Sequence, residues 1–264
     1  MTPSIYSLFV LGAILTCVLT PLVRQLALRK GFVDCPQRAR KVHHQATPRL
    51  GGAAILFSLL TVSLLAGFTV PQYREMLWGN NPIIGIVLLG SLGIFVIGFL
   101  DDLARLSPKI KLFGEFLIAG IVVWGADFSF THVQFLGSGS ISFPQWVGFG
   151  LASLWIVGLA NAINLIDGLD GLASGITLAG LIAVTVVGHL AGITGVTFLS
   201  TLLIGCLLGF LVFNSRPASI FLGDCGSLTL GYLAGCLTFL ASFREGGVID
   251  GIFPCLAFAL PILD

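Results

Sequence analysis

Residues 82–102 read PIIGIVLLGSLGIFVIGFLDD, an uncharged run of 19 residues that ends in two adjacent aspartates, Asp101 and Asp102. An apolar run of about 20 residues is the length that an α-helix needs to cross the hydrocarbon core of a bilayer. The whole chain has this character, since 56% of its 264 residues are hydrophobic and only 9% are charged. Because a soluble domain usually carries about 25% charged residues, the composition indicates a membrane protein.

Apolar windows recur along the whole chain and predict an all-α polytopic membrane protein, a single domain over residues 1–264 with nine transmembrane helices. Alternation around a Gly-Ser-Gly predicts a short external β-hairpin near residues 130–144. The first span lacks the basic start and the cleavage site of a signal peptide, so we expect it to be retained. The predicted spans are residues 4–23, 50–70, 82–100, 112–128, 145–164, 172–190, 195–213, 226–243 and 248–263.

Lysine and arginine predict the orientation, because they are retained on the cytosolic side of a membrane. With the N-terminus outside, 11 of the 13 lysines and arginines fall in cytosolic segments, and only Arg74 and Arg244 fall outside. Three acidic motifs then follow the third, fifth and seventh spans, all at their cytosolic ends. The sequence therefore predicts that these motifs converge on one site at the cytosolic face.

The first acidic motif is the aspartate pair, Asp101 and Asp102, at the end of the third span. The C-terminus of a helix carries partial negative charge, so acids are disfavoured there. Such a placement makes sense when a cation, or a proton to be moved, is nearby. The alternative is a solvated helix end that Arg105 and Lys109 neutralise.

The second motif, NAINLIDGLDG at residues 161–171, ends the fifth span. Asn161 and Asn164 are three residues apart and share a helix face, in an apolar span where unpaired amides are costly. Asp167 and Asp170 follow, and oxygens of Asp and Asn suit a hard cation such as Mg²⁺. The alternative is a polar contact that closes a cytosolic turn.

The third motif, FNSRPASIFLGDCGS at residues 213–227, joins the seventh span to the eighth. Asp224 precedes a helix start, where it would cap the helix or bind a metal ion that brings phosphate to the helix N-terminus. The first cytosolic loop holds seven basic residues between Arg24 and Arg49, which positive-inside topology explains equally well. Together these features predict Mg²⁺-dependent phosphoryl chemistry at a membrane, where the protein mainly positions groups and neutralises charge.

Four segments resemble, in order, the motifs of the bacterial polyprenyl-phosphate N-acetylhexosamine-1-phosphate transferases. They are VDCPQRARKVHHQATPRLGG, GFLDDLARLSPKIKL, NAINLIDGLDGLASG and FNSRPASIFLGDCGSLTLG. The resemblance implies that a polyprenyl phosphate attacks the β-phosphorus of a UDP-N-acetylhexosamine at the cytosolic face of the bacterial cytoplasmic membrane and releases UMP. It implies a Mg²⁺ cofactor, for which Mn²⁺ could substitute, and no nucleic acid partner.

The basic loop RKVHHQATPRLGG is similar to that of the enzymes that use UDP-GlcNAc to start teichoic acid, O-antigen and related glycans. The alternative within the superfamily is the phospho-N-acetylmuramoyl-pentapeptide transferase of peptidoglycan synthesis. The family continues past the ninth span into a loop with a histidine motif, so we expect this chain to be truncated. The alternative from another class is an ion-coupled transporter. The acidic residues are predicted at one membrane face rather than midway across the membrane, and this position disfavours a transporter.

The resemblance implies a role for individual residues. The implied catalytic residues are Asp101, Asp102, Asp167 and Asp170, of which the first two would handle the lipid phosphate. The implied metal ligands are Asp224, Asp167 and Asn164. The implied substrate-binding residues are Lys41, His43, Arg49, Lys111, Asn161, Asn164, Asn214 and Phe221.

Overall fold

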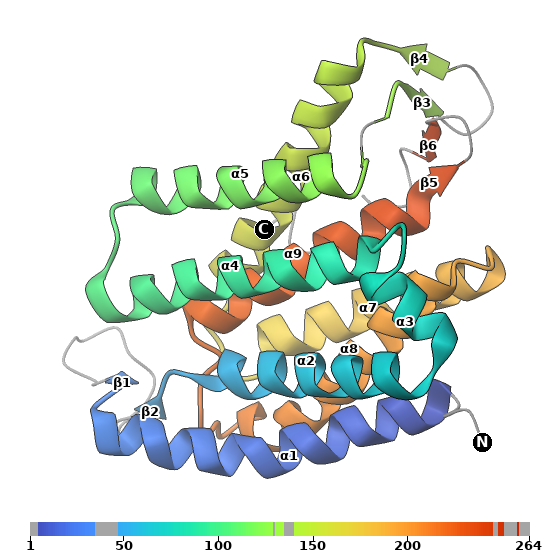
Figure 1. Ribbon diagram of the computed structural model, residues 1–264. Helices are drawn as coiled ribbons and strands as arrows, with labels where there is room; N and C mark the ends of the chain where they lie inside the picture. Colours follow the sequence, from blue (N-terminus) through green and yellow to red (C-terminus); the bar gives the residue numbers. More distant parts are fainter. Residues whose placement is uncertain are drawn as a thin grey trace.

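The computed structural model describes residues 5–34, 47–128, 130–134, 140–244, 248–250 and 258, which form nine helices and six short strands (Figure 1). The helices are α1 (Ile5–Lys30), α2 (Gly51–Thr69), α3 (Pro71–Trp78), α4 (Ile83–Ala104), α5 (Pro108–Gly125), α6 (Gln145–Ile166), α7 (Leu172–Leu190), α8 (Thr194–Asn214) and α9 (Asp224–Ser242). The strands are β1 (Val33–Asp34), β2 (Thr47–Pro48), β3 (His132–Gln134), β4 (Ser140–Ser142), β5 (Phe243–Arg244) and β6 (Val248–Asp250).

Seven of these helices are long and apolar enough to cross a membrane, namely α1, α2, α4, α6, α7, α8 and α9. A helix suits the bilayer because it bonds its backbone N–H and C=O groups within the segment. The 18-residue α5 lies beside α4 but carries Lys109, Lys111 and Glu115, so it is not among the seven. The prediction of an all-α polytopic membrane protein is confirmed.

Eight of the nine predicted spans coincide with long helices, but several of their boundaries differ by a few residues. Helix α1 runs on to Lys30 rather than residue 23, because basic residues in its last turn favour the negative end of a helix. Helix α5 begins at Pro108 rather than residue 112, where the Ser107 side chain accepts from the backbone N of Ile110. The predicted span at 248–263 lies mostly outside the described residues, and its start forms β6 instead, which pairs with β3 and β5.

Helix α9 lies at the centre of the bundle, in contact with α2, α4, α6, α7 and α8 (Figure 1). All of its residues are buried except Asp224 and Leu240. The packing is close enough that a Cβ on Gly231 would lie 2.5 Å from the Cα of Ala160 on α6. Small residues of this kind let helix backbones approach in membrane proteins, so the position of α9 is fixed by five neighbours.

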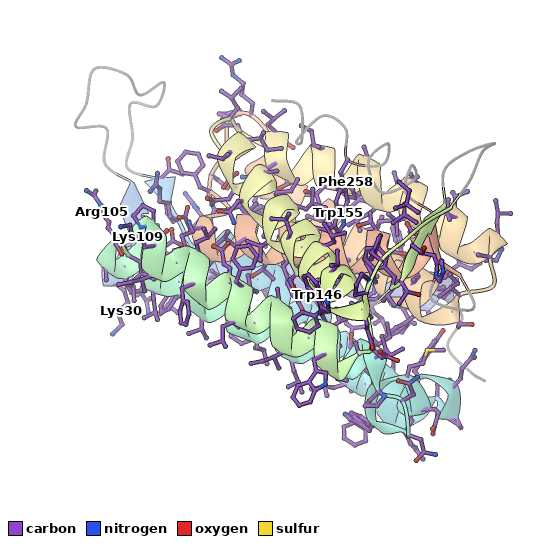
Figure 2. All side chains as sticks on the ribbon, turned by 90° about the horizontal axis from the view of Figure 1, so that it is seen from above. Lys30, Arg105, Lys109, Trp146, Trp155 and Phe258 are labelled. Carbon is purple, nitrogen blue, oxygen red and sulfur yellow. The ribbon has the colours of Figure 1, made fainter. Side chains whose placement is uncertain are left out.

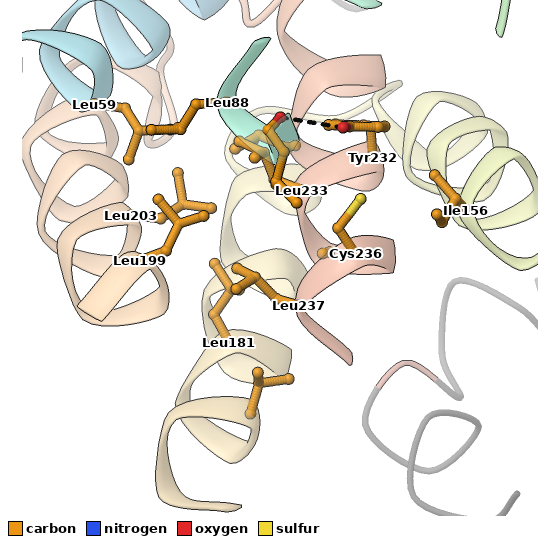
Figure 3. Close-up of a cluster of buried hydrophobic side chains, with 14 of the residues drawn as sticks. Leu59, Leu88, Ile156, Leu181, Leu199, Leu203, Tyr232, Leu233, Cys236 and Leu237 are labelled. Atoms are coloured by element: carbon orange, nitrogen blue, oxygen red, sulfur yellow. Dashed lines mark hydrogen bonds between the residues drawn. The ribbon is translucent and has the colours of Figure 1, made fainter. Parts of the chain in front are cut away.

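Figure 3 shows the apolar core around α9, where Leu233 and Leu237 lie near Leu199 and Leu203 of α8. The phenol of Tyr232, which is fully buried, donates to the backbone oxygen of Val87 on α4 at 3.1 Å. This bond ties α9 to α4 in the middle of the bundle.

We expect Tyr232→Phe to lower the stability of the protein by about 1 kcal/mol, the typical net value of one buried hydrogen bond. Thermal unfolding in detergent measures this loss. Tyr6→Phe is the matched control, because the Tyr6 side chain is 77% exposed on α1. Equal effects of the two substitutions would contradict a stabilising role for the Tyr232 bond.

The two ends of the bundle differ in structure and charge. At one end β3 pairs antiparallel with β4, so the predicted hairpin is confirmed, and β6 and β5 extend it to a sheet of order β4-β3-β6-β5. At the other end lie β1 and β2 (Figure 1). Figure 2 shows Lys30, Arg105 and Lys109 at this second end, so basic side chains gather where the acidic motifs lie.

Candidate active site

The three acidic motifs meet at the end of the bundle that carries β1 and β2. Helix α4 ends just after Asp101 and Asp102, α6 ends just after Asn164, and α9 begins at Asp224. Helix α5 starts at the same end and contributes Lys111. The convergence predicted for these motifs is therefore present in the structure.

Lys111 lies at the centre of this convergence. Its Nζ atom donates to Asp101 Oδ2 at 2.7 Å, to Asp224 Oδ2 at 3.0 Å and to Asn164 Oδ1 at 3.3 Å. The side chains of Lys111 and Asp101 are each only 13% exposed, so water screens this ion pair less than it screens one at a surface. Three oxygens from three helices thus surround one positive charge; we call these four residues the Lys111 cluster.

Asn164 joins α6 to α9 within the Lys111 cluster. Its Nδ2 atom donates to Asp224 Oδ1 at 3.2 Å and to Ser227 Oγ at 2.8 Å. Because both partners of the Asn164 nitrogen are acceptors here, the Asn164 oxygen faces the Lys111 ammonium. The predicted pairing of this membrane amide is present, and its partners lie on another helix.

Asp102 has a different environment from its neighbour Asp101. Its carboxylate accepts from the backbone N atoms of Asp224 at 3.1 Å and Cys225 at 3.0 Å. These N–H groups begin α9, where a helix has unpaired donors and partial positive charge. Asp102 therefore caps α9 from the end of α4, a role that the sequence suggested for Asp224 itself.

Glycines allow α2 and α4 to approach the start of α9 closely. A Cβ on Gly98 of α4 would lie 2.5 Å from the backbone oxygen of Asp224, and one on Gly52 of α2 would lie 2.1 Å from the Cα of Gly226. A side chain at either position would collide with backbone. The glycines of the predicted motifs are thus required for helix contact beside the site.

Arg49 reaches the site through backbone pairing. The backbone N of Phe221 donates to the oxygen of Pro48 at 2.8 Å, and Arg49 forms an isolated parallel bridge with Phe221. The Arg49 side chain is exposed and Phe221 is half-buried. This pairing brings the end of the first basic loop beside the segment before α9.

Asp167 follows the last residue of α6 and is half-buried. Burial, together with the negative charges of Asp224 and Asp102, raises the pKa of its carboxyl to about 8, and Arg49 opposes the shift. The carboxyl therefore favours its neutral form near pH 7 unless positive charge is added nearby. A cation bound beside it would restore the ionised form.

Asp170 and Asn214 both bind the segment between α8 and α9. Asp170 Oδ2 accepts from the backbone N of Ala218 at 3.0 Å. Asn214 is buried, donates to the oxygen of Ile220 at 3.0 Å and accepts from Ser174 Oγ at 3.2 Å. These contacts are with the protein itself, so the catalytic role of Asp170 and the substrate role of Asn214 stay predictions.

Asn161 pairs with a residue that the sequence did not single out. Its Nδ2 atom donates to Glu115 Oε2 of α5 and to the backbone oxygen of Val157 at 3.0 Å. Glu115 is fully buried. An acid inside a predicted membrane span is a functional signal, and Glu115 lies in the predicted span at 112–128, so that signal was available in the sequence. Lys41 and His43, two predicted substrate-binding residues, lie outside the described residues.

The donor set suits a divalent cation that shares its ligands with a substrate. Among the residues that the structure describes, no three His, Cys, Asp or Glu side chains form a group that could hold a metal ion alone. Mg²⁺ in phosphoryl-transfer sites is usually held by one or two carboxylates together with substrate phosphates. The Lys111 ammonium already occupies a position among two carboxylates and an amide oxygen, so the cluster accepts positive charge.

Comparison with known proteins identifies the family of the chain. The sequence pattern of glycosyl transferase family 4 matches residues 84–242. The chain is 36% identical over 258 residues to the probable undecaprenyl-phosphate N-acetylglucosaminyl 1-phosphate transferase of Bacillus subtilis. The aligned region covers 97% of this chain and 68% of that protein.

Two further relatives have other substrates in their names. The chain is 31% identical to the phospho-N-acetylmuramoyl-pentapeptide-transferase of Staphylococcus saprophyticus, over 86% of this chain and 73% of that protein. It is 36% identical to the decaprenyl-phosphate N-acetylglucosaminephosphotransferase of Mycolicibacterium smegmatis, over 88% of this chain and 58% of that protein. The family match spans α4 to α9 and so includes the whole Lys111 cluster. The chain therefore belongs to glycosyl transferase family 4.

Proposed function

We propose that this protein transfers N-acetylglucosamine 1-phosphate from UDP-GlcNAc to a polyprenyl phosphate, forming a polyprenyl diphosphate sugar and releasing UMP. The observation that carries the proposal is the Lys111 cluster, in which Asp101, Asn164 and Asp224 turn three oxygens toward one positive charge. The names of the relatives support the reaction class. The positive-inside pattern supports a cytosolic site in a bacterial cytoplasmic membrane.

In this proposal one set of residues binds the cation and another binds a phosphate of the substrate. Asp224, Asn164 and Asp167 would hold Mg²⁺, which when bound supplies neutralisation of the diphosphate. The exposed Arg49 side chain beside Phe221 would bind a phosphate of the nucleotide, because guanidinium pairs well with phosphate oxygens.

The two adjacent aspartates take separate roles in this proposal. Asp101 faces Lys111 and would orient the polyprenyl phosphate, or take its proton, before the phosphate attacks. Asp102 is committed to two backbone N–H groups of α9. Its contribution to the reaction is thus to hold the start of α9, and with it Asp224, in place.

The phospho-N-acetylmuramoyl-pentapeptide transfer of peptidoglycan synthesis is the second candidate, which the relative from Staphylococcus saprophyticus supports. Both reactions have the same acceptor chemistry and the same leaving group. The donor sugar alone separates them. We favour GlcNAc because the relatives with 36% identity carry N-acetylglucosamine in their names.

We expect the purified protein in detergent to release UMP from UDP-GlcNAc only when undecaprenyl phosphate and Mg²⁺ are both present. A coupled assay for UMP measures this, with UDP-MurNAc-pentapeptide as the competing donor and undecaprenol, which lacks the phosphate, as the control acceptor. Faster turnover of the pentapeptide donor would replace the first candidate by the second. Ion flux into liposomes without UDP-sugar, together with no UMP release, would favour a transporter instead.

A further inference from the structure

Glu115 is a buried acid that the proposed reaction does not use. It is fully buried on α5, and its Oε2 atom accepts from Asn161. Its Oε1 atom has no hydrogen-bond partner among the residues that the structure describes. A buried carboxylate oxygen without a partner is costly, so the position suggests a partner that reaches it in another state of the protein.

Lys111 is the candidate that we consider for that partner. Lys111 and Glu115 are four residues apart on α5, so their side chains lie on the same helix face. The facing surface of α6 presents Asn164 to Lys111 and Asn161 to Glu115. The two helices are thus joined by two polar contacts, and the positive charge of Lys111 acts on Glu115. A lysine ammonium on its flexible stem can exchange one acceptor for another.

A divalent cation and the Lys111 ammonium compete for the same oxygens. Two of the proposed cation ligands, Asn164 and Asp224, each have an oxygen within 3.3 Å of Lys111 Nζ. Like charges repel strongly at such distances where water is partly excluded. When a divalent cation binds these oxygens, the ammonium must therefore leave, and a free carboxylate oxygen one helical turn away is the favourable place to receive it.

We propose that Glu115 Oε1 is the second binding position of the Lys111 ammonium, occupied when a divalent cation held by Asp224, Asn164 and Asp167 displaces the ammonium from Asn164 and Asp224. This inference rests on the proposed function, because the cation is the one that the proposed reaction uses. Glu115 is then a positioning residue. It sets how tightly the cation binds, because it stabilises the state in which the ammonium has moved aside.

The test is the binding of Mn²⁺ to the purified protein in detergent, without substrates, measured by electron paramagnetic resonance of the free ion. Glu115→Gln keeps the side-chain shape and an oxygen for Asn161 but removes the charge that receives the ammonium. A charge-assisted hydrogen bond is about twice as strong as a neutral one, so we expect Mn²⁺ affinity to fall about tenfold, which corresponds to about 1.4 kcal/mol. Glu75→Gln, at an exposed residue of α3, is the matched control and leaves the Mn²⁺ affinity unchanged.

Lys111→Met completes a double-mutant cycle. Removing the competing ammonium raises Mn²⁺ affinity, and in the Lys111→Met background Glu115→Gln no longer changes it, because no ammonium remains to be received. An equal loss of affinity in both backgrounds would show that Glu115 acts without Lys111 and would overturn the inference. Weaker binding in Lys111→Met alone would overturn it even if Glu115→Gln did not fold.

The failure of this inference is distinguishable from the failure of the proposed function. If Mn²⁺ affinity falls on substitution of Asp224 but does not change in Glu115→Gln, the inference alone is overturned and the proposed cation site stands. No Mn²⁺ binding to the unaltered protein would overturn both the inference and the proposed cation. UMP release is then the separate measurement that decides whether the transfer reaction occurs.

Discussion

Asp224→Asn lowers the rate of UMP release from UDP-GlcNAc and undecaprenyl phosphate by about a thousandfold, the upper range for loss of one electrostatic group in an active site. Asp224 accepts hydrogen bonds from both Lys111 and Asn164, so its carboxylate connects α5, α6 and α9. The amide keeps the size of the side chain but removes the negative charge. In the proposed reaction that charge also holds the cation, so both substrate placement and charge neutralisation fail together.

Asp127→Asn is the matched control for this prediction. Asp127 is exposed and lies at the end of α5 away from the Lys111 cluster, with a φ of 49°. Asparagine tolerates this left-handed conformation well, so the same chemical change should leave the rate of UMP release near that of the unaltered protein. Retained activity in Asp224→Asn, with a folded protein by thermal unfolding, would remove Asp224 from the proposed cation site.

Gly98→Ala lowers the stability of the protein by about 3 kcal/mol, at the upper end of the usual cost of overpacking. The new Cβ would lie 2.5 Å from the backbone oxygen of Asp224 and 2.6 Å from the Cα of Cys225. These obstacles are backbone atoms, so no side chain can move aside. Helix α4 must separate from α9, which weakens both bonds from Asp102 to the start of α9. We therefore expect a lower unfolding temperature in detergent together with a loss of UMP release.

Gly158→Ala tests whether this effect is local. Gly158 lies in the middle of α6, and a Cβ there would meet no atom within 4 Å among the described residues. Alanine favours a helix over glycine by about 1 kcal/mol, so stability should hold or rise. A comparable loss in Gly158→Ala would mean that any glycine in a membrane helix is sensitive, and that the contact of α4 with α9 is not special.

The membrane fold was largely predictable because hydropathy is a property of neighbouring residues. Each window of about 20 apolar residues needs a helix to satisfy its backbone in a bilayer, whichever helices surround it. The hairpin near residues 130–144 was also predictable from local alternation and turn residues. The start of the last predicted span was wrong because Val248–Asp250 pairs with β3, a strand more than 100 residues earlier in the chain.

The residue types of the site were predictable, but their partners were not. Asp101 and Asp102 are chemically identical neighbours, and only the crossing of α4 with α9 gives one to Lys111 and the other to the α9 backbone. Lys111 was predicted to bind substrate from its place after the aspartate pair, whereas its bonds reach residues 53 and 113 positions away. Its role toward substrate stays a prediction.

The amino-acid sequence by itself determined which segments form long apolar helices, and it predicted that the acidic motifs gather at one end of the bundle. Those features follow from transfer free energies, which each segment obeys on its own. Only the tertiary structure decided that side-chain oxygens from three helix ends contact the Lys111 ammonium. It also decided that Glu115 is buried one helical turn from Lys111, with its Oε1 atom unpaired among the described residues. Such contacts depend on how closely glycine-lined backbones approach one another, and no local pattern in the chain encodes that distance.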